Sequence, residues 1–555
     1  MAHFSSTLSI LALTTASLAA QATIHLPGDY PTINHAIIAA ASGDTILVGP
    51  GVYFEQGLDF QGKDIVLRST DGPTVTFIFG NGNGRLFTFH NGETTAAVLE
   101  GFTLTNGRAP AGALGSPGVD GGAGGHGGSI LVQGASPTIA RCVFTNNWAG
   151  NGGRGGDGPD GWDGDPAGDG TDGGAGGHGG SGGAIAVDGG SPTLLGCVFA
   201  ANRTGRGGAG GDGGRGGDGD DGGIFSPGGD GGDGGDGGRG GDGGSGGGIC
   251  VLSGSAGIVN CTFHDNFVET FGVGGDRGMG GFGGSGIPSG DDGVDGTDGA
   301  DGLWIGGGAF DDRVGSSTMT SSLIWQNGTS DVLGTATLTY CDVEHGYAGT
   351  GNFSLHPQWE SDHMHLTATS PCIDAGDPTA TGAPSLDVDG EPRVAGSAVD
   401  VGADEFLVVA SLTTFGCGVN PAGSLMWLAG IPSPGENLVL GVDNPLGTQA
   451  QGTFAFLLVS LNATPLYPCG IGVPGFGMSG PGAVGDILVD LNTAVVFINA
   501  LWYGVGTPAP GVIPIPTGSG TYGMKFYAQG LMLDPVAAQG VGFALTNGIE
   551  YVVGL

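Results

Sequence analysis

An 18-residue segment that recurs four times constrains this chain more than any other feature. The copies span residues 130–147, 185–202, 249–266 and 310–327, and the connections between them are 37, 46 and 43 residues long. A segment that keeps its length while its connections vary indicates a repeated architecture that carries insertions. Such repeats are typical of solenoids, whose units bury their apolar faces only against their neighbours.

The spacing of apolar residues predicts β structure. The first copy holds the pairs Ile130/Val132 and Cys142/Phe144, and side chains two residues apart share one face of a strand. Each copy has a Gly or Ser-Pro turn near its middle, and none holds the ten or so residues of 3.6-periodic pattern that a helix needs. Each copy is therefore predicted to form most of one coil of a parallel β-helix, with equivalent residues stacked about 4.8 Å apart.

Stacked coils would place equivalent side chains in ladders. We expect two inward ladders and one asparagine ladder at the coil end, where stacked amides can satisfy turn backbone groups and tolerate left-handed φ. We assign the asparagines a structural role and no ligand role. The three predicted ladders are Cys142, Cys197 and Cys261; Phe144, Phe199, Phe263 and Ile324; and Asn147, Asn202, Asn266 and Asn327.

The net charge limits the partners that the chain can have. Fifty-three acidic residues against 14 basic ones give a formal charge of −39. This charge repels phosphate backbones and anionic lipids, so we expect no nucleic-acid or peripheral membrane binding. The partners that remain are cations and extracellular polysaccharides or cell-surface components.

The amino terminus predicts export. Residues 4–20 form a mildly apolar stretch, and an A-x-A site, Ala20-Gln21-Ala22, follows it. This pattern indicates a signal peptide over residues 1–22. No later stretch approaches the roughly 18 apolar residues of a membrane helix. A secreted or cell-surface location permits disulfides. Cys417 and Cys469 could form one, and the ladder cysteines are expected to be small buried hydrophobes.

The region after the signal peptide carries a family resemblance. Residues 32–41 form an apolar stripe of a short helix, which would cover the open end of a β-helix. The run PGDYPTINHAIIAAASGDTILVGPGVYFE and the later GKDIVLRS resemble the opening of right-handed parallel β-helix proteins of the pectin-lyase-like superfamily. The SPTIARCVFTNN-type coils resemble repeats of that group in bacterial secreted proteins. The resemblance covers residues 23–406 and implies the fold more strongly than any activity.

The carboxyl-terminal part shows two further resemblances. The motifs SPCIDAGDP, DVDGEPRV and VDVGADEF are similar to a closing module of bacterial surface β-helix proteins, and the tract PCGIGVPGFGMSGPGAVGD resembles a domain of secreted planctomycete-type proteins, which implies sorting or anchoring. About eight short strands separated by Pro/Gly turns predict a β-sandwich there. The predicted all-β organisation is a signal peptide 1–22, a right-handed parallel β-helix 23–406 with a cap 23–60, Gly-rich inserts within 108–309 and a closing module 355–406, and a β-sandwich 407–555.

The Gly-rich inserts leave each coil just after the ladder asparagine, so they emerge side by side from one edge. Their triplets read G-G-x, with Asp as the commonest third residue. The default interpretation is flexible, solvated loops; the alternative is extended three-per-turn helices packed through their glycine faces with Asp outward. Collagen is excluded because it has one Gly per triplet. Weak Ca²⁺ binding is an expectation, since no EF-hand or nonapeptide calcium motif is present.

The resemblance makes a carbohydrate enzyme the first class to test. Lyases of that group combine carboxylate-bound Ca²⁺ with an Arg or Lys base, and hydrolases place acidic pairs about 5 to 10 Å apart. In the copies, Arg141 is replaced at equivalent positions by Gly196, Asn260 and Ser321, while Asp188 and Asp265 are isolated. We therefore find no repeated catalytic pair.

Two smaller constellations are also interpreted as structural. Asp311 and Asp312 beside Arg313 predict a salt-bridged loop. His363 and His365 alternate on a strand with the neighbouring carboxylates, Glu360 and Asp362, on its opposite face, which predicts an exposed pair and no metal site.

The sequence thus predicts an exported, monomeric protein of structural, adhesive or interaction role. We expect no catalytic, cofactor-binding or metal site, and no required cofactor. The alternative is a polysaccharide lyase or hydrolase, or a glycan-binding module, that uses the β-helix face.

Overall fold

The computed structural model describes residues 21–328, 330–379, 382–516, 523–537 and 540–554, so the predicted signal peptide lies outside the described residues up to residue 20. The chain divides into two compact units. The first contains Met1–Thr339, Val343–Ser354 and Val388–Gly390, and the second contains Tyr340–Asp342, Leu355–Asp387 and Glu391–Leu555. Most of the segment 355–406 assigned to a closing module therefore lies in the second unit.

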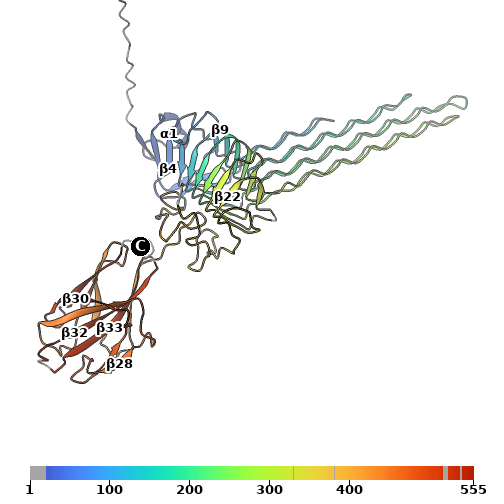
Figure 1. Cartoon of the computed structure of the whole chain (residues 1–555). Helices are drawn as coiled ribbons and strands as arrows, with labels where there is room; N and C mark the ends of the chain where they lie inside the picture. The colour runs from blue at the N-terminus through green and yellow to red at the C-terminus, as the bar shows by residue number, and fades with distance from the viewer. Residues whose placement is uncertain (1–20, 329, 380–381, 517–522, 538–539, 555) are drawn as a thin grey trace, which may run out of the picture. The chain divides into compact units, whose positions relative to one another are not determined.

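The first unit is a parallel β-helix with three sheets (Figure 1). The first sheet contains, in spatial order, β1 (Thr23–Leu26), β2 (Thr45–Val48), β4 (Val66–Ser69), β7 (Val98–Glu100), β10 (Thr138–Ala140), β13 (Thr193–Leu195), β16 (Gly257–Val259), β19 (Thr318–Thr320) and β22 (Thr337–Thr339). The second contains β3 (Gly51–Tyr53), β5 (Thr76–Phe79), β8 (Thr103–Thr105), β11 (Val143–Thr145), β14 (Val198–Ala200), β17 (Thr262–His264), β20 (Leu323–Trp325) and β23 (Asp342–Val343). The third contains β6 (Phe87–Phe89), β9 (Ile130–Ala135), β12 (Ile185–Gly190), β15 (Ile249–Ser253), β18 (Phe310–Asp312) and β21 (Val332–Gly334). Each repeat copy supplies one strand to every sheet.

The predicted inward ladders are present. Phe144, Phe199, Phe263 and Ile324 are in register on neighbouring strands, and the first three rings stack with centroids 4.8 and 4.7 Å apart. The cysteine ladder is also fully buried, with free thiols. Burial raises the pKa of its Cys142 thiol well above the usual value, which leaves it protonated and unreactive.

The asparagine ladder runs through four coils. The side-chain amide of Asn147 donates to Asn202 Oδ1 at 3.0 Å, Asn202 donates to Asn266 Oδ1 at 2.9 Å, and Asn266 donates to Asn327 Oδ1 at 2.8 Å. Each Oδ1 also accepts the backbone N–H of the asparagine before it. The structural role is thus confirmed.

The left-handed φ was expected at the ladder asparagines and lies one residue earlier. The chain bends just before each asparagine enters the interior, so the bend residue carries the positive φ and the asparagine does not. The bend residues are Asn146 (55°), Ala201 (55°), Asp265 (54°) and Gln326 (59°).

The predicted helix is α1 (Ile33–Ala39), and it packs against β1 and β2, the first strands of the β-helix. Thr32 is its N-cap, and the Thr32 hydroxyl accepts the His35 N–H. Ile33, Ala36 and Ile37 are fully buried. Burial of one apolar stripe over the first coil gives the end of the solenoid a cover.

The second unit contains the antiparallel sheets expected of a β-sandwich. One sheet is β24 (Ser411–Phe415), β33 (Phe543–Val552), β32 (Lys525–Leu533), β27 (Thr453–Ser460) and β30 (Val495–Trp502); the others are β25 (Leu425–Ala429), β26 (Asn437–Val442) and β31 (Ala509–Pro514), and the pair β28 (Ile471–Pro474) and β29 (Val484–Ile487). Leu440, Leu457 and Trp502 lie in its apolar core. Cys417 and Cys469 form a disulfide, as the sequence suggested. Among the described residues, no helix has the length and apolar character needed to cross a membrane.

Candidate functional site

The Gly-rich inserts form an ordered body, which we call the glycine bundle: residues 108–129, 148–184, 203–248 and 267–309. Each insert runs outward and then returns, and the long inserts lie side by side as extended strings (Figure 1). The default interpretation of solvated loops is therefore wrong, and the packed three-per-turn alternative agrees with the structure. Two glycines in each triplet have no side chain, which lets neighbouring backbones approach closely.

Backbone hydrogen bonds join the strings of the bundle in a continuous lattice. Gly153 donates to Gly122, Gly177 to Gly153, Gly208 to Gly177 and Gly241 to Gly208, at 2.8 to 2.9 Å between N and O. The bonds therefore cross from insert to insert and back. Because most triplets of the inserts have glycine at two positions, the strings have few apolar side chains to pack, so this lattice takes the place of a hydrophobic core.

The aspartates of the triplets belong to the same lattice. Asp212 N–H donates to Asp157 Oδ1 at 3.0 Å, and Asp276 N–H donates to Asp212 Oδ1 at 3.0 Å. The return strings repeat the pattern, with Thr297 N–H bound to Asp236 Oδ1 at 2.7 Å. The backbone and hydroxyl bonds from Thr297 lower the pKa of Asp236. Asp at the third position is therefore a bonding residue as well as a source of charge.

A column of cations and rings lies at the root of the bundle. The first residues of the inserts are Arg108, Trp148, Arg203 and Phe267, and isolated parallel bridges align them. Arg203 lies 5.6 Å from the Trp148 ring centre and 5.3 Å from that of Phe267, and Arg108 lies 5.2 Å from Trp148. Such cation–π contacts stabilise the junction. The sequence carries a signal for this column, since the first residues of successive inserts alternate between arginine and an aromatic residue.

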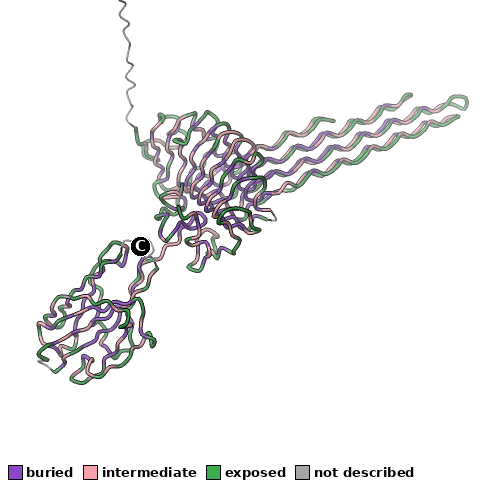
Figure 2. The backbone as a smooth tube through the Cα atoms, viewed as in Figure 1, coloured by how far each residue is buried: buried purple, intermediate pink, exposed green. Residues whose placement is uncertain are grey.

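Exposed residues lie at the outer turns of the inserts (Figure 2), and several of the residues near these turns are large and apolar. Trp162 is 71% exposed, Ile224 is 76% exposed, Phe225 is 94% exposed and Ile287 is 69% exposed. The turns of the two longest inserts touch, since Ile287 N–H donates to Ser226 O at 3.2 Å. Exposed apolar side chains also occur along the inserts, such as Met279 and Phe282, and apolar groups exposed together are a feature of contact surfaces.

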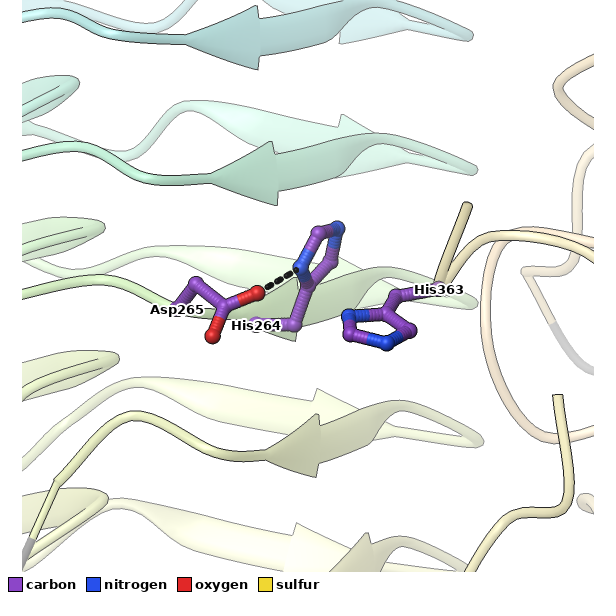
Figure 3. A group of neighbouring side chains, drawn as sticks. All are labelled: His264, Asp265 and His363. Atoms are coloured by element: carbon purple, nitrogen blue, oxygen red, sulfur yellow. Dashed lines mark hydrogen bonds and ion pairs between the residues drawn. The ribbon is translucent and has the colours of Figure 1, made fainter. Parts of the chain in front are cut away.

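The charged residues on the β-helix coils have local partners. Asp188 accepts a hydrogen bond from the Ser253 hydroxyl at 3.0 Å. Figure 3 shows Asp265 beside His264, with His264 Nδ1 2.9 Å from Asp265 Oδ2. Arg141, which occupies the position of a candidate base, binds Glu100 at 2.8 Å. The contacts of Asp188, Asp265 and Arg141 hold the coils together. These three residues do not pair with one another as a catalytic acid and base would.

The cluster at residues 311–313 is the expected salt-bridged loop. Arg313 Nε lies 3.0 Å from Oδ2 of Asp311, whose side chain is buried. The carboxylate of Asp312 accepts the backbone N–H groups of Val314, Gly315 and Ser317 at 3.2, 2.9 and 3.0 Å. Asp312 therefore organises a turn, and its oxygens already have donors.

His363 and His365, both in the second unit, do not share a strand face. The chain turns at His363, which has φ 57° and stacks its ring on Trp359 at 4.9 Å. The turn breaks the expected alternation and brings His365 Nδ1 to 2.5 Å from Asp362 Oδ2. The expectation that Asp362 points to the opposite face is therefore wrong.

One group of possible metal ligands lies within the first unit. Asp331, Glu344 and His345 place one ligand atom each within 4.8 Å of the others. His345 Nδ1 is 2.7 Å from Asp331 Oδ2, so a hydrogen bond already joins two of the three. Burial raises the pKa of Asp331. The sequence gives no signal for this group, because a coil connection separates Asp331 from Glu344 and His345 along the chain.

Comparisons with known proteins add little to this geometry. No family model matches the chain, and no curated protein matches it. A search of solved structures found a pectate lyase, Pel9A, at 12% sequence identity and a TM-score of 0.20, covering 70% of this chain and 97% of that chain. A TM-score this low supports no inference on activity, and the β-helix rests on the parallel sheets of the chain itself.

Proposed function

We propose that this chain is an exported protein, secreted or held at a cell surface, with a structural or adhesive role and no catalytic turnover. The observation that carries the proposal is the glycine bundle, a hydrogen-bonded body with apolar side chains at its outer ends. Export follows from the predicted signal peptide. Sorting or anchoring by the carboxyl-terminal β-sandwich follows from its resemblance to planctomycete-type domains.

The bundle is suited to contact because its backbone is already ordered before any partner arrives. A flexible glycine chain would lose roughly 1–2 kcal/mol of conformational entropy per residue on being fixed. The lattice between the strings meets this cost during folding, so contact with a partner requires little further ordering. An extracellular polysaccharide or a cell-surface component of low negative charge fits a molecule of net charge −39.

A polysaccharide lyase or hydrolase on the β-helix face is the alternative. Its strongest candidate cluster is Asp311, Asp312 and Arg313, where Asp311 is neutralised by Arg313 and Asp312 is bonded to three backbone N–H groups. A carboxylate in either condition is a poor general base or metal ligand. These contacts favour the non-catalytic proposal.

The test exposes the purified full chain to immobilised uronate-rich and neutral polysaccharides, with and without Ca²⁺, and measures both retention and cleavage. We expect retention without cleavage, and at least tenfold weaker retention for the double variant Ile224→Ser/Phe225→Ser. The matched control is Val536→Ser, which removes a side chain that is 77% exposed in the second unit.

Cleavage would overturn the proposal in favour of an enzyme. Loss of cleavage in Asp312→Asn would then place its site on the fourth coil, and cleavage that survives would place it elsewhere. If the chain is neither retained by nor cleaves any of the polysaccharides, the adhesive role toward glycans is rejected and the structural role remains.

Weak Ca²⁺ binding by the aspartates of the bundle is part of the same proposal. The lattice bonds of aspartates such as Asp157 and Asp169 use Oδ1 of the carboxylate. The other oxygen can contact a cation, but one oxygen per residue makes a loose site.

A further inference from the structure

A cavity at the root of the glycine bundle has a different character from the acidic surface around it. Its volume is about 290 Å³, close to the lower end of the range of about 300–1,000 Å³ for small-molecule sites. It lies where the return strings of the inserts approach the third sheet of the β-helix. Its polar lining residues are His126, His178, Ser181, Asp242 and Arg313.

The histidines replace aspartate at this end of the bundle. Farther along the return strings, Asp169 Oδ1 and Asp172 Oδ1 accept the N–H of the next string. At the cavity, His126 Nδ1 accepts Ser181 N–H at 2.9 Å, and His178 Nδ1 accepts Asp242 N–H at 3.0 Å. The lattice bond is thus kept while the negative charge of the side chain is removed.

This bonding fixes which ring nitrogen carries the proton. Because Nδ1 accepts a backbone N–H, the neutral imidazole must carry its hydrogen on Nε2. Burial, together with the charges of Arg313 and Arg85, lowers the pKa of His126, which keeps this ring neutral. Each histidine therefore offers one Nε2–H donor.

Arginine adds positive charge at the same place. Arg313 uses Nη2 to bind the hydroxyls of Ser245 at 2.6 Å and Ser181 at 3.3 Å, and Nε to bind Asp311 at 3.0 Å. These bonds hold the Arg313 guanidinium at the wall of the cavity. Arg85 donates to the carbonyls of His126 and residue 127, at 2.6 and 2.9 Å.

Charges of both signs lie around the cavity. Asp311 is paired with Arg313, and Asp242 Oδ1 binds Arg239 at 2.5 Å. Within the described part of the chain, no carboxylate lies within 4.0 Å of Arg85. Asp188 acts on His126 against the positive charges of Arg313 and Arg85, and Asp242 Oδ2 lies 3.4 Å from His178 Nδ1. The two imidazole N–H groups and the Arg313 guanidinium are therefore the donors on which binding of an anion depends.

We propose that this cavity binds an oxyanion, the carboxylate or sulfate group of a small molecule, through His126 Nε2–H, His178 Nε2–H and the Arg313 guanidinium. Oxyanions take several N–H donors at once, and bonds to a charged acceptor are stronger than neutral ones. The site does not depend on the adhesive role, because it lies at the root of the bundle, whereas Ile224 and Phe225 lie at the outer turn of their insert.

The test titrates the full chain with sodium sulfate and, separately, sodium acetate by calorimetry, against sodium chloride at matched ionic strength. The variant is His126→Asn/His178→Asn. Asn keeps the lattice bond, since Asn151 Oδ1 accepts Arg206 N–H at 3.0 Å in the equivalent position, but it lacks a donor where Nε2–H lies. We expect affinity to fall roughly tenfold for each histidine lost.

The matched control is Asp172→Asn, which changes a lattice side chain of the same face away from the cavity. It should bind as the wild type does, and thermal unfolding checks that every variant is folded. Binding of sulfate alone or acetate alone identifies which of the two groups the cavity accepts. No binding beyond that of chloride, or equal binding by the histidine double variant, would overturn the proposal.

Discussion

At the scale of single residues, the ladder asparagines show how one side chain can hold two coils. Asn202 is fully buried, donates to Phe144 O at 2.9 Å and accepts the Asn147 N–H at 3.1 Å. Each contact satisfies a backbone group that has no water nearby. An unsatisfied buried polar group costs about 1–3 kcal/mol, so the ladder stabilises the coils mainly by avoiding this cost.

We expect Asn202→Ala to lower the free energy of unfolding by about 2–4 kcal/mol, because it orphans two backbone groups. Urea unfolding followed by tryptophan fluorescence measures the change. Gln133→Ala, an exposed change on a neighbouring coil, should cost less than about 0.5 kcal/mol. A similar loss in both variants would contradict the structural role of the ladder.

Asp342, the first residue of β23, makes the stability of the fold around it depend on pH. Burial raises the pKa of Asp342 to about 7, although Leu355 N–H and the Cys372 thiol bind its carboxylate. The unfolded chain ionises near pH 3.9, so the folded state holds an extra proton between about pH 4 and pH 7. Stability is therefore fully present below about pH 4 and is lost as the pH rises through 7.

Asp342→Asn should remove this loss, which reaches up to about 4 kcal/mol at about 1.4 kcal/mol per pKa unit. The variant should gain stability over the wild type at pH 8 and should lose that advantage toward pH 4, as measured by thermal unfolding. Glu360→Gln, an exposed change in the same unit, is the control. A constant difference between variant and wild type across this range would refute the assignment.

At the scale of elements, the bundle depends on glycine at two of three positions. A Cβ on Gly177 would lie 1.9 Å from Gly122 O and 2.5 Å from Gly122 C. We expect Gly177→Ala to separate the strings at a cost of about 3 kcal/mol or more. Hydrogen–deuterium exchange should show lost protection around residues 149–182. Gly257→Ala, where an added Cβ meets nothing within 4 Å, should leave that protection unchanged.

The aspartate columns predict weak calcium binding. Open sites of few oxygens bind Ca²⁺ with a Kd of about 10⁻⁴–10⁻³ M, and we expect this class of affinity by calorimetry. Asp157→Asn/Asp212→Asn should weaken binding while the amide oxygens keep the lattice bonds. A Kd below about 10⁻⁵ M would instead indicate a built site.

At the scale of the whole molecule, the two units are stabilised by different means. The β-helix has stacked ladders, whereas the second unit has an apolar core and a disulfide between Cys417 and Cys469, 52 residues apart. Closing a loop of this length stabilises a fold by about 4 kcal/mol in the chain-entropy estimate. Stability therefore has a redox-dependent part only in the second unit.

Reduction, or Cys417→Ser/Cys469→Ser, should lower the unfolding temperature of the second unit by several degrees. Differential scanning calorimetry measures the unfolding temperatures of both units. A chain that ends after residue 354 identifies which transition belongs to the β-helix. The β-helix transition should not respond, because its ladder cysteines are free thiols. An equal shift of both transitions would contradict this division.

The sequence by itself determined the solenoid, its ladders, the cap helix and the disulfide partners, because each follows from a periodic or local pattern. Cys142, Phe144 and Asn147 recur at constant spacing, and constant spacing in a β-helix means stacking. The sequence could not determine the state of the inserts, since a G-G-x string has the same pattern whether it is solvated or packed. Only the tertiary structure decided this, by placing the strings close enough for the Gly177 N–H to reach Gly153 O. The cavity of His126, His178 and Arg313 was hidden for the same reason, because residues of four inserts and one coil meet only when those strings are in register.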